Sequence, residues 1–257
     1  MSRSPRRVEA PGPFRVDQLR PGDRYELHEG HAIYCAPMEG DGARRVGTAF
    51  EVLDSDPAVE SAGTDAGFAL RPGTLRAPDV SVGGVPDRPG WIQDAVPPLV
   101  VEYAGVGQEE DLLREKIADL LAAGTRFIWV VRLVGLRRVE IHEPGQPVRT
   151  VVPGDVLLAP GILQNSVPVA ALFDRDAAHE VTLRNLLQRR GYQSLDAVKT
   201  EGRAKGLREA ILQVLAARAI PVDEAARARI AGCTDDARLS RWIERAATST
   251  DLAAILE

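Results

Sequence analysis

The apolar positions of this chain form two regions with different periodicities. In the first, short apolar runs separated by turn residues predict strands, and the runs at 99–103 and 127–131 are continuous, as is typical of buried strands. Between these runs, residues 109–123 have the spacing of an amphipathic helix, and Gly124 follows as its expected C-terminal cap. This order predicts a strand–helix–strand unit whose helix packs across a sheet.

Further strands and one helix are expected around this unit. Residues 24–36 predict a hairpin with its turn at Glu29-Gly30, and residues 42–54 predict a helix with one apolar side. The other expected strands are 67–70, 74–82, 137–142 and 148–152, and the segment ends at 167–173. The predicted fold class is therefore α/β, with a mixed central sheet flanked by helices.

After residue 173 the pattern is helical throughout. Helices are expected at 179–190, 195–219, 223–230 and 235–247, separated by Gly191, Pro221 and Gly232. Three parts follow from these patterns: a flexible N-terminal tail (1–13), an α/β domain (14–173) and a helical C-terminal region (174–257). We expect the helical region to serve dimerisation or contact with a partner or nucleic acid, with no second catalytic domain.

Composition narrows the possible classes of protein. The net charge is −5, with 18 basic against 24 acidic residues in 1–173 and 14 against 13 in 174–257, so neither part is a general nucleic-acid-binding surface. The sequence has neither a secretory signal nor an apolar run long enough to span a membrane, so a cytoplasmic protein without a membrane partner is expected. Cys35 and Cys233 are expected to be buried free thiols, because their spacing fits neither a disulfide framework nor a zinc site.

One lysine occupies an unusual position. Only three of the 32 basic residues are lysines, and Lys116 falls inside the apolar arc of its helix, about 40° from Leu112, whereas Asp119 falls on the polar side. An inward lysine needs an anion, and Glu102, in the middle of an apolar strand, equally needs a cation or a metal. This pair is either a buried structural salt bridge or part of a functional site.

Asp79 adds a second carboxylate on a neighbouring strand. Aspartate after a proline is often a turn residue, but two acidic residues on adjacent strands supply the oxygen ligands that Mg²⁺ prefers. A nearby lysine can then orient the attacking water or neutralise the phosphate in the transition state. Asp79, Glu102 and Lys116 together are typical of metal-dependent phosphodiester cleavage. Their ammonium and carboxylate groups are expected within a few ångströms of one another.

Several short blocks of this sequence resemble a known family. The blocks are Pro-Asp-Val-Ser-Val at 78–82, Pro-Leu-Val-Val-Glu at 98–102, Lys116 within 115–120, Ala-Gly-Thr-Arg-Phe-Ile-Trp-Val-Val at 123–131, and Tyr-Glu-Leu-His-Glu-Gly at 25–30. Together they are similar to the Uma-two family, a restriction-endonuclease branch of the PD-(D/E)XK nuclease superfamily, over residues 14–173. The resemblance implies a restriction-endonuclease-like core for this part of the chain.

The resemblance also implies roles for individual residues. Asp79 and Glu102 would be metal ligands, with the Tyr103 backbone carbonyl beside them, and Lys116 would be the catalytic lysine on the helix, since Ala104 stands two residues after the glutamate. Glu26 matches a recurrent acidic position of the family and either assists the metal site or is structural. The chain departs from the family's usual Val-x-Ser-Pro after the glutamate and lacks its histidine near Arg44-Arg45, which concerns substrate handling more than metal binding.

The sequence thus predicts a metal-dependent endonuclease that acts on nucleic acid, with DNA the expected substrate, in a restriction, defence or mobile-element context. Mg²⁺ is the expected ion, Mn²⁺ a substitute for it, and a homodimer is expected because cutting two strands needs two sites. The alternative is a non-catalytic protein of the same fold that binds nucleic acid or recruits a partner, in which Asp79, Glu102 and Lys116 form only a buried ion network.

Two weaker signals do not change this interpretation. The glycines in 104–107 lie between a strand and a helix, as in a dinucleotide-binding loop, but Glu110 stands at the third glycine position. His28 and His31 are too weak a pair for a metal site, because three residues apart on an extended segment they are expected on opposite sides. Both are expected at the surface.

Overall fold

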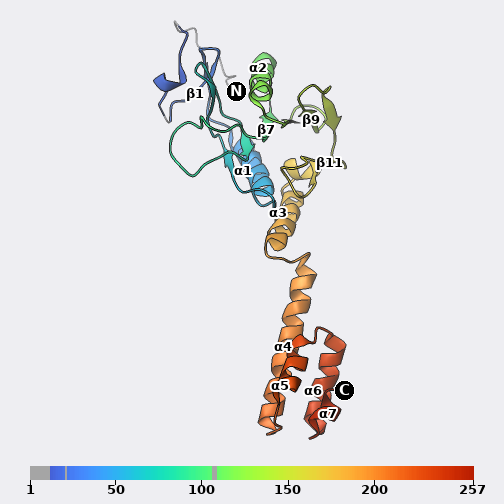
Figure 1. Ribbon diagram of the computed structural model, residues 1–257. Helices are drawn as coiled ribbons and strands as arrows, with labels where there is room; N and C mark the ends of the chain where they lie inside the picture. Colours follow the sequence, from blue (N-terminus) through green and yellow to red (C-terminus); the bar gives the residue numbers. More distant parts are fainter. Residues whose placement is uncertain (1–11, 21, 106–108) are drawn as a thin grey trace. The chain divides into compact units, whose positions relative to one another are not determined.

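The computed structural model describes residues 12–20, 22–105 and 109–257 (Figure 1). The chain divides into two compact units, Met1–Arg189 and Arg190–Glu257. Most of the expected N-terminal tail, and part of the glycine-containing stretch 104–107, lie outside the described residues.

The first unit is built on a six-stranded mixed sheet with the order β10-β9-β8-β7-β6-β3. The strands are β3 (Ala62–Thr64), β6 (Val80–Val82), β7 (Leu99–Ala104), β8 (Phe127–Arg132), β9 (Arg138–His142) and β10 (Arg149–Val151). Only β7 and β8 run parallel, and the other neighbouring pairs are antiparallel. Their crossover is α2 (Glu110–Ala123), which ends at Gly124 in the left-handed conformation (φ 117°). The predicted strand–helix–strand unit and mixed α/β fold are confirmed.

A second, four-stranded sheet has the order β2-β1-β5-β4. Its strands are β1 (Tyr25–His28), β2 (His31–Tyr34), β4 (Phe68–Arg71) and β5 (Thr74–Arg76). β1 and β2 form the expected hairpin, whose two turn residues Glu29 and Gly30 both have positive φ (48° and 83°). Such a turn suits the right-handed twist of a hairpin and places His28 opposite His31.

The prediction of a single strand at 74–82 is wrong, because this segment forms two strands that belong to different sheets. β5 pairs with β1 and β4, whereas β6 pairs with β3 and β7. Pro78 interrupts the segment because it has no N–H for a ladder. The neighbouring Ala77 instead donates its N–H to Glu26 (3.2 Å), and its carbonyl accepts a hydrogen bond from Lys116 (2.8 Å). The break places Asp79 between the two sheets, immediately before β6.

Helices cover both faces of the six-stranded sheet. Leu99 and Val101 of β7 belong to the apolar cluster that includes α1 (Gly40–Asp54), whereas Val100 and Ala104 belong to the cluster that includes α2. This alternation follows from the two-residue period of a strand. The remaining small elements of this unit are η1 (Val16–Gln18), β11 (Val156–Leu157), β12 (Val167–Pro168) and η2 (Val169–Leu172).

Helix α3 (Arg175–Arg189) completes the first unit. It begins four residues before the expected helix and packs beside α1. The buried Asn185 side chain donates to the Val52 carbonyl and the Ser55 hydroxyl, both at 3.2 Å, which satisfies polar groups at the end of α1. The compact unit therefore continues to Arg189, beyond the expected domain end at residue 173. That residues 14–173 form a nuclease domain stays a prediction.

The second unit is helical, as expected. Its helices are α4 (Leu195–Ala217), α5 (Glu224–Gly232), α6 (Asp236–Thr248) and α7 (Leu252–Ile255), and their apolar sides surround Trp242, which is 1% exposed. The four-residue α7 was not expected, because it is too short to show a helical period. Within the part of the chain that the structure describes, no helix is long and apolar enough to cross a membrane.

Two leucines of the first unit offer a matched test of its core. Leu99 in β7 is fully buried, whereas Leu136, between β8 and β9, is 85% exposed. We expect Leu99→Ala to lower the free energy of unfolding by about 3–5 kcal/mol, because it leaves a cavity between sheet and helix. Leu136→Ala should change it by less than about 0.5 kcal/mol. Urea denaturation followed by circular dichroism measures both, and equal losses would contradict this description of the core.

Candidate active site

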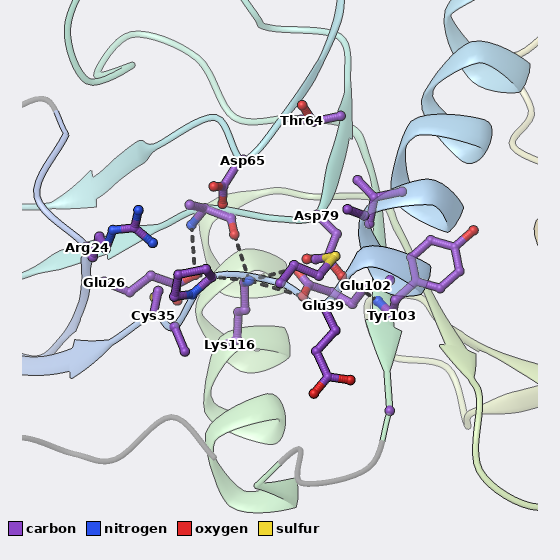
Figure 2. A pocket seen from close by; sticks show the side chains of 18 of the residues that line it. Arg24, Glu26, Cys35, Glu39, Thr64, Asp65, Asp79, Glu102, Tyr103 and Lys116 are labelled. Atoms are coloured by element: carbon purple, nitrogen blue, oxygen red, sulfur yellow. Dashed lines mark hydrogen bonds and ion pairs between the residues drawn. The ribbon is translucent and has the colours of Figure 1, made fainter. Parts of the chain in front are cut away.

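The ammonium group of Lys116 lies at the centre of a cluster of buried charges (Figure 2). Its Nζ is 2.9 Å from Glu102 Oε1 and 3.0 Å from Glu26 Oε1, and it donates to the Ala77 carbonyl at 2.8 Å. The Lys116 side chain is 12% exposed, so it points inward from α2, as the helical spacing indicates. The three carboxylates of Glu102, Glu26 and Asp79 hold the pKa of Lys116 above its ordinary value and outweigh the opposing effect of burial.

Glu102 meets Lys116 because of its position in β7. Its neighbours two residues away, Val100 and Ala104, face α2, so the Glu102 side chain is directed to the same side. Burial raises the pKa of Glu102 to about 8, aided by the charges of Asp79 and Glu26 and opposed by Lys116. A carboxylate with this pKa is mostly protonated at neutral pH in the absence of a further cation.

Asp79 lies beside this pair without contacting the lysine. Its Oδ2 accepts the Tyr103 backbone N–H at 2.6 Å, and among the described residues it has no ion pair with Lys116 within 4 Å. The expected contact between Lys116 and a carboxylate thus occurs with Glu102 but not with Asp79. The remaining donors of the ammonium go to Glu26 and to the Ala77 carbonyl. Burial raises the pKa of Asp79, opposed by Lys116 and the Tyr103 N–H.

Glu26 belongs to the cluster, a possibility that the sequence left open. Besides Lys116 it contacts Arg76, whose Nη1 donates to Glu26 Oε2 at 3.1 Å, and the Arg76 side chain is 1% exposed. Burial raises the pKa of Glu26, but the charges of Lys116 and Arg76 outweigh it and the net pKa is lowered. Glu26 is therefore held ionised between two cations.

Arg76 and Asp119 are members of the cluster that the sequence did not single out. Arg76 Nε donates to Asp119 Oδ2 at 2.9 Å, and Asp119 is buried although its helical position predicted the polar side. Two signals in the sequence could have identified them. Arg76 lies in a strand-like run three residues before Asp79, and Asp119 lies one helical turn after Lys116.

The prediction that His28 and His31 face opposite sides is wrong. The prediction that both lie at the surface is wrong for His28. The two-residue turn makes His28 and His31 cross-strand partners, so they lie on the same side of the hairpin. His31 is exposed, but His28 is half-buried, and its Nδ1 lies 2.8 Å from Asp119 Oδ2. His28 therefore extends the cluster toward the hairpin.

Five members of the cluster line a cleft of about 1270 Å³ in the first unit: Glu26, Arg76, Asp79, Glu102 and Lys116. Figure 2 shows Glu26, Lys116, Glu102 and Asp79 gathered along it, with Cys35 beside them. Cys35 and Cys233 are free, and Cys233 is buried as expected, whereas Cys35 is half-buried. Burial and the charge of Glu26 raise the pKa of Cys35 to about 12, so its thiol stays neutral and is not a nucleophile at neutral pH.

The cluster has an excess of negative charge. Four carboxylates (Glu26, Asp79, Glu102 and Asp119) face two cations (Lys116 and Arg76) when all are ionised. Glu102 Oε1 is buried and lies 2.9 Å from the Lys116 ammonium, which also donates to Glu102 Oε2 at 3.1 Å. A divalent cation would compensate the excess negative charge.

The carboxylates of this site suit Mg²⁺ better than a metal ion whose ligands all come from the protein. No group of three or more His, Cys, Asp or Glu side chains in the described part of the chain is arranged to hold an ion. Mg²⁺ usually binds through one or two carboxylates and keeps several waters or substrate oxygens. Asp79 and Glu102 are two carboxylates that line the same cleft.

The raised pKa of Glu102 predicts how stability depends on pH without metal. Between the ordinary value of 4.5 and about 8, folded Glu102 keeps a proton that the unfolded chain releases, so the free energy of unfolding falls as pH rises. One such group contributes a slope of up to about 1.4 kcal/mol per pH unit. Glu102→Gln should therefore flatten the decline. Urea denaturation in EDTA at about pH 5, 6.5 and 8 measures this, and equal slopes in variant and wild type would contradict it.

The fold and the sequence both have relatives among known proteins. A crystal structure of "a putative nuclease belonging to DUF820" from Anabaena variabilis ATCC 29413 superposes with a TM-score of 0.54 and 18% identity, covering 65% of this chain and 99% of that chain. At this identity the likeness shows a shared fold. No curated protein matches the chain. The model of the Uma2 family, described as "Putative restriction endonuclease", matches residues 14–170. Since that match spans more than half of the sequence, the chain belongs to the Uma2 family.

Proposed function

We propose that this protein is a metal-dependent endonuclease that hydrolyses phosphodiester bonds of nucleic acid, with DNA as the substrate. The observation that carries the proposal is the Lys116 ammonium fixed between Glu102 and Glu26, with Asp79 beside them, in an open cleft. Membership of the Uma2 family and the nuclease-like fold support the same class of activity.

In this proposal Asp79 and Glu102 hold Mg²⁺, for which Mn²⁺ substitutes, with the Tyr103 backbone carbonyl as a further ligand. A bound ion of this kind polarises a phosphoryl oxygen and lowers the pKa of a coordinated water. The Tyr103 N–H orients the Asp79 carboxylate through its 2.6 Å hydrogen bond. Glu102 enters the site from a fully buried stretch of β7, which restricts its movement.

Lys116 acts in this proposal as a fixed cation and not as a base. Its raised pKa keeps it protonated at neutral pH, so it orients water and neutralises charge that develops on the phosphate. An ammonium has three N–H donors, and here Glu26, Glu102 and the Ala77 carbonyl take all three. Release of the Glu102 contact would free one donor for the substrate while Glu26 and Ala77 keep the ammonium in place.

The biological setting belongs to the same proposal. We infer cleavage of DNA in a restriction, defence or mobile-element context within the cytoplasm. A homodimer would bring two sites to the two strands of a duplex.

Substitution of the three proposed catalytic residues tests the activity. Asp79→Asn, Glu102→Gln and Lys116→Met should each lower cleavage by about 10²-fold or more, because each removes a charge that stabilises the transition state. Lys199→Met is the matched control, since Lys199 is 68% exposed in the second unit. The measurement is a gel assay with single- and double-stranded DNA and RNA in Mg²⁺ or Mn²⁺, with folding checked by circular dichroism. The proposal fails if wild type cleaves no substrate, or if Lys116→Met stays fully active.

The second candidate is a non-catalytic protein that binds nucleic acid or recruits a partner. The observation in its favour is that Lys116 already has three acceptors, so the cluster also makes sense as a structural ion network. Under this alternative the cluster would hold the two sheets together and would have no need of a metal.

Metal titration distinguishes the two candidates. For a nuclease, Mg²⁺ or Mn²⁺ should raise the unfolding midpoint of wild type, by an amount equivalent to about 2.7 kcal/mol at 100 times the dissociation constant. Asp79→Asn should remove most of this shift. For a structural network, neither ion should shift the midpoint of any of the proteins, whereas loss of the buried ammonium in Lys116→Met should lower the midpoint under either candidate and does not separate them. Differential scanning fluorimetry measures all three proteins.

A further inference from the structure

A group of four arginines beside the cleft has no carboxylate partner. Arg44 and Arg45 lie on α1, Arg137 lies just before β9, and Arg175 is the first residue of α3. None of them makes an ion pair with a described residue, whereas Arg76, at the centre of the site, contacts two carboxylates. We call Arg44, Arg45, Arg137 and Arg175 the arginine patch.

The arginine patch surrounds Phe173, where η2 ends. Arg45 Nη1 donates to the Phe173 carbonyl at 3.3 Å, and the Arg137 guanidinium lies over the Phe173 ring, 5.8 Å from its centroid. Arg44, Arg45 and Arg175 line a small hollow of about 130 Å³. Arg45 and Phe173 line both this hollow and the main cleft, so the two form one continuous surface.

Part of the arginine patch has an unsatisfied donor. The Nε of Arg45 is buried and has no hydrogen-bond partner in the structure, which is unusual for a charged group. Two carboxylates, Asp41 and Asp174, also line the hollow. Asp174 accepts the Ala177 N–H at 2.9 Å and so serves the N-terminus of α3. Three guanidinium groups, of Arg44, Arg45 and Arg175, thus face two carboxylates in the hollow, which has a positive excess.

Tyr103 connects the arginine patch with the proposed catalytic residues. Its backbone N–H holds Asp79, and its hydroxyl donates to the Leu172 carbonyl at 3.1 Å, next to Phe173. Figure 2 shows the Tyr103 ring directed away from the Lys116 ammonium. Tyr103 therefore contacts Asp79 through its backbone and, through its hydroxyl, reaches the residue next to Phe173, which the arginine patch surrounds.

We propose that the arginine patch binds a backbone phosphate of nucleic acid adjacent to the phosphodiester that is cut. The planar guanidinium fork matches phosphate oxygens, and unpaired arginines supply it without breaking an ion pair. The patch would also give an acidic protein, of net charge −5, a local attraction for nucleic acid. This inference rests on the proposed function and adds to it the place where the substrate backbone is held.

Equilibrium binding without cleavage tests the inference. A fluorescent DNA duplex is titrated with protein in EDTA over a range of salt concentrations, and an RNA of the same length forms a second arm. Arg44→Gln, Arg175→Gln and the double variant Arg44→Gln/Arg45→Gln should weaken binding, the double variant by about 10-fold or more. They should also reduce the slope of log K against log[salt] by about 0.9 for each phosphate that the variant no longer neutralises. Arg71→Gln is the matched control, because Arg71 is exposed on β4 outside the cleft, and it should change binding less than about 2-fold.

The outcomes separate this inference from the nuclease proposal. Affinity and salt slope that are unchanged in all patch variants overturn the inference even if wild type cleaves DNA. Absence of any binding of DNA or RNA by wild type also overturns it. Patch-dependent binding of either probe supports the inference even if no cleavage occurs, and in that case only the nuclease proposal fails. Arg44 and Arg175 are exposed, so their variants keep the test valid if the half-buried Arg45 proves necessary for folding.

Discussion

The ion cluster around Lys116 is the constraint on which the rest of the first unit depends. A buried ammonium is costly unless acceptors surround it, and here they come from β1, β7 and the connection between β5 and β6. α2 can dock on the sheet only where Glu102 and Glu26 both reach its lysine. The same contacts join the four-stranded sheet to the six-stranded one, and they keep Asp79 at the boundary between the two.

The cluster is more acidic than a structural network requires. Arg76 and Lys116 hold Glu26 ionised, whereas Asp79 and Glu102 have raised pKa values because burial is not fully compensated. Two buried carboxylates whose charge is not fully compensated lower the stability of the fold when no further cation is present. Their retention is the physical argument for a divalent cation. In the two proposals the arginine patch holds a phosphate and the carboxylates of Asp79 and Glu102 hold a metal, which would let an acidic protein bind a polyanion.

Local patterns in the sequence predicted the elements nearest the site. The apolar runs and helical period located β7, α2 and β8, and the angle of Lys116 on its helix predicted its contact with Glu102. Arg76 and Asp119 were missed because each is buried through contact with the other, and they are 43 residues apart in the chain. The split of 74–82 was missed because pairing with different sheets is a long-range property. Similarly, the contact of α3 with α1 depends on Asn185, which reaches residues about 130 positions away.

The central claim is that Asp79 and Glu102 form one metal site, with Lys116 fixed beside it. A crystal of the protein soaked in Mn²⁺ and measured at the manganese absorption edge tests it most directly. One anomalous peak is expected in the cleft within about 2.3 Å of oxygens of both carboxylates, and it should be lost in Asp79→Asn. A crystal with an accessible cleft and no peak there, or with a peak that contacts neither carboxylate, would contradict it.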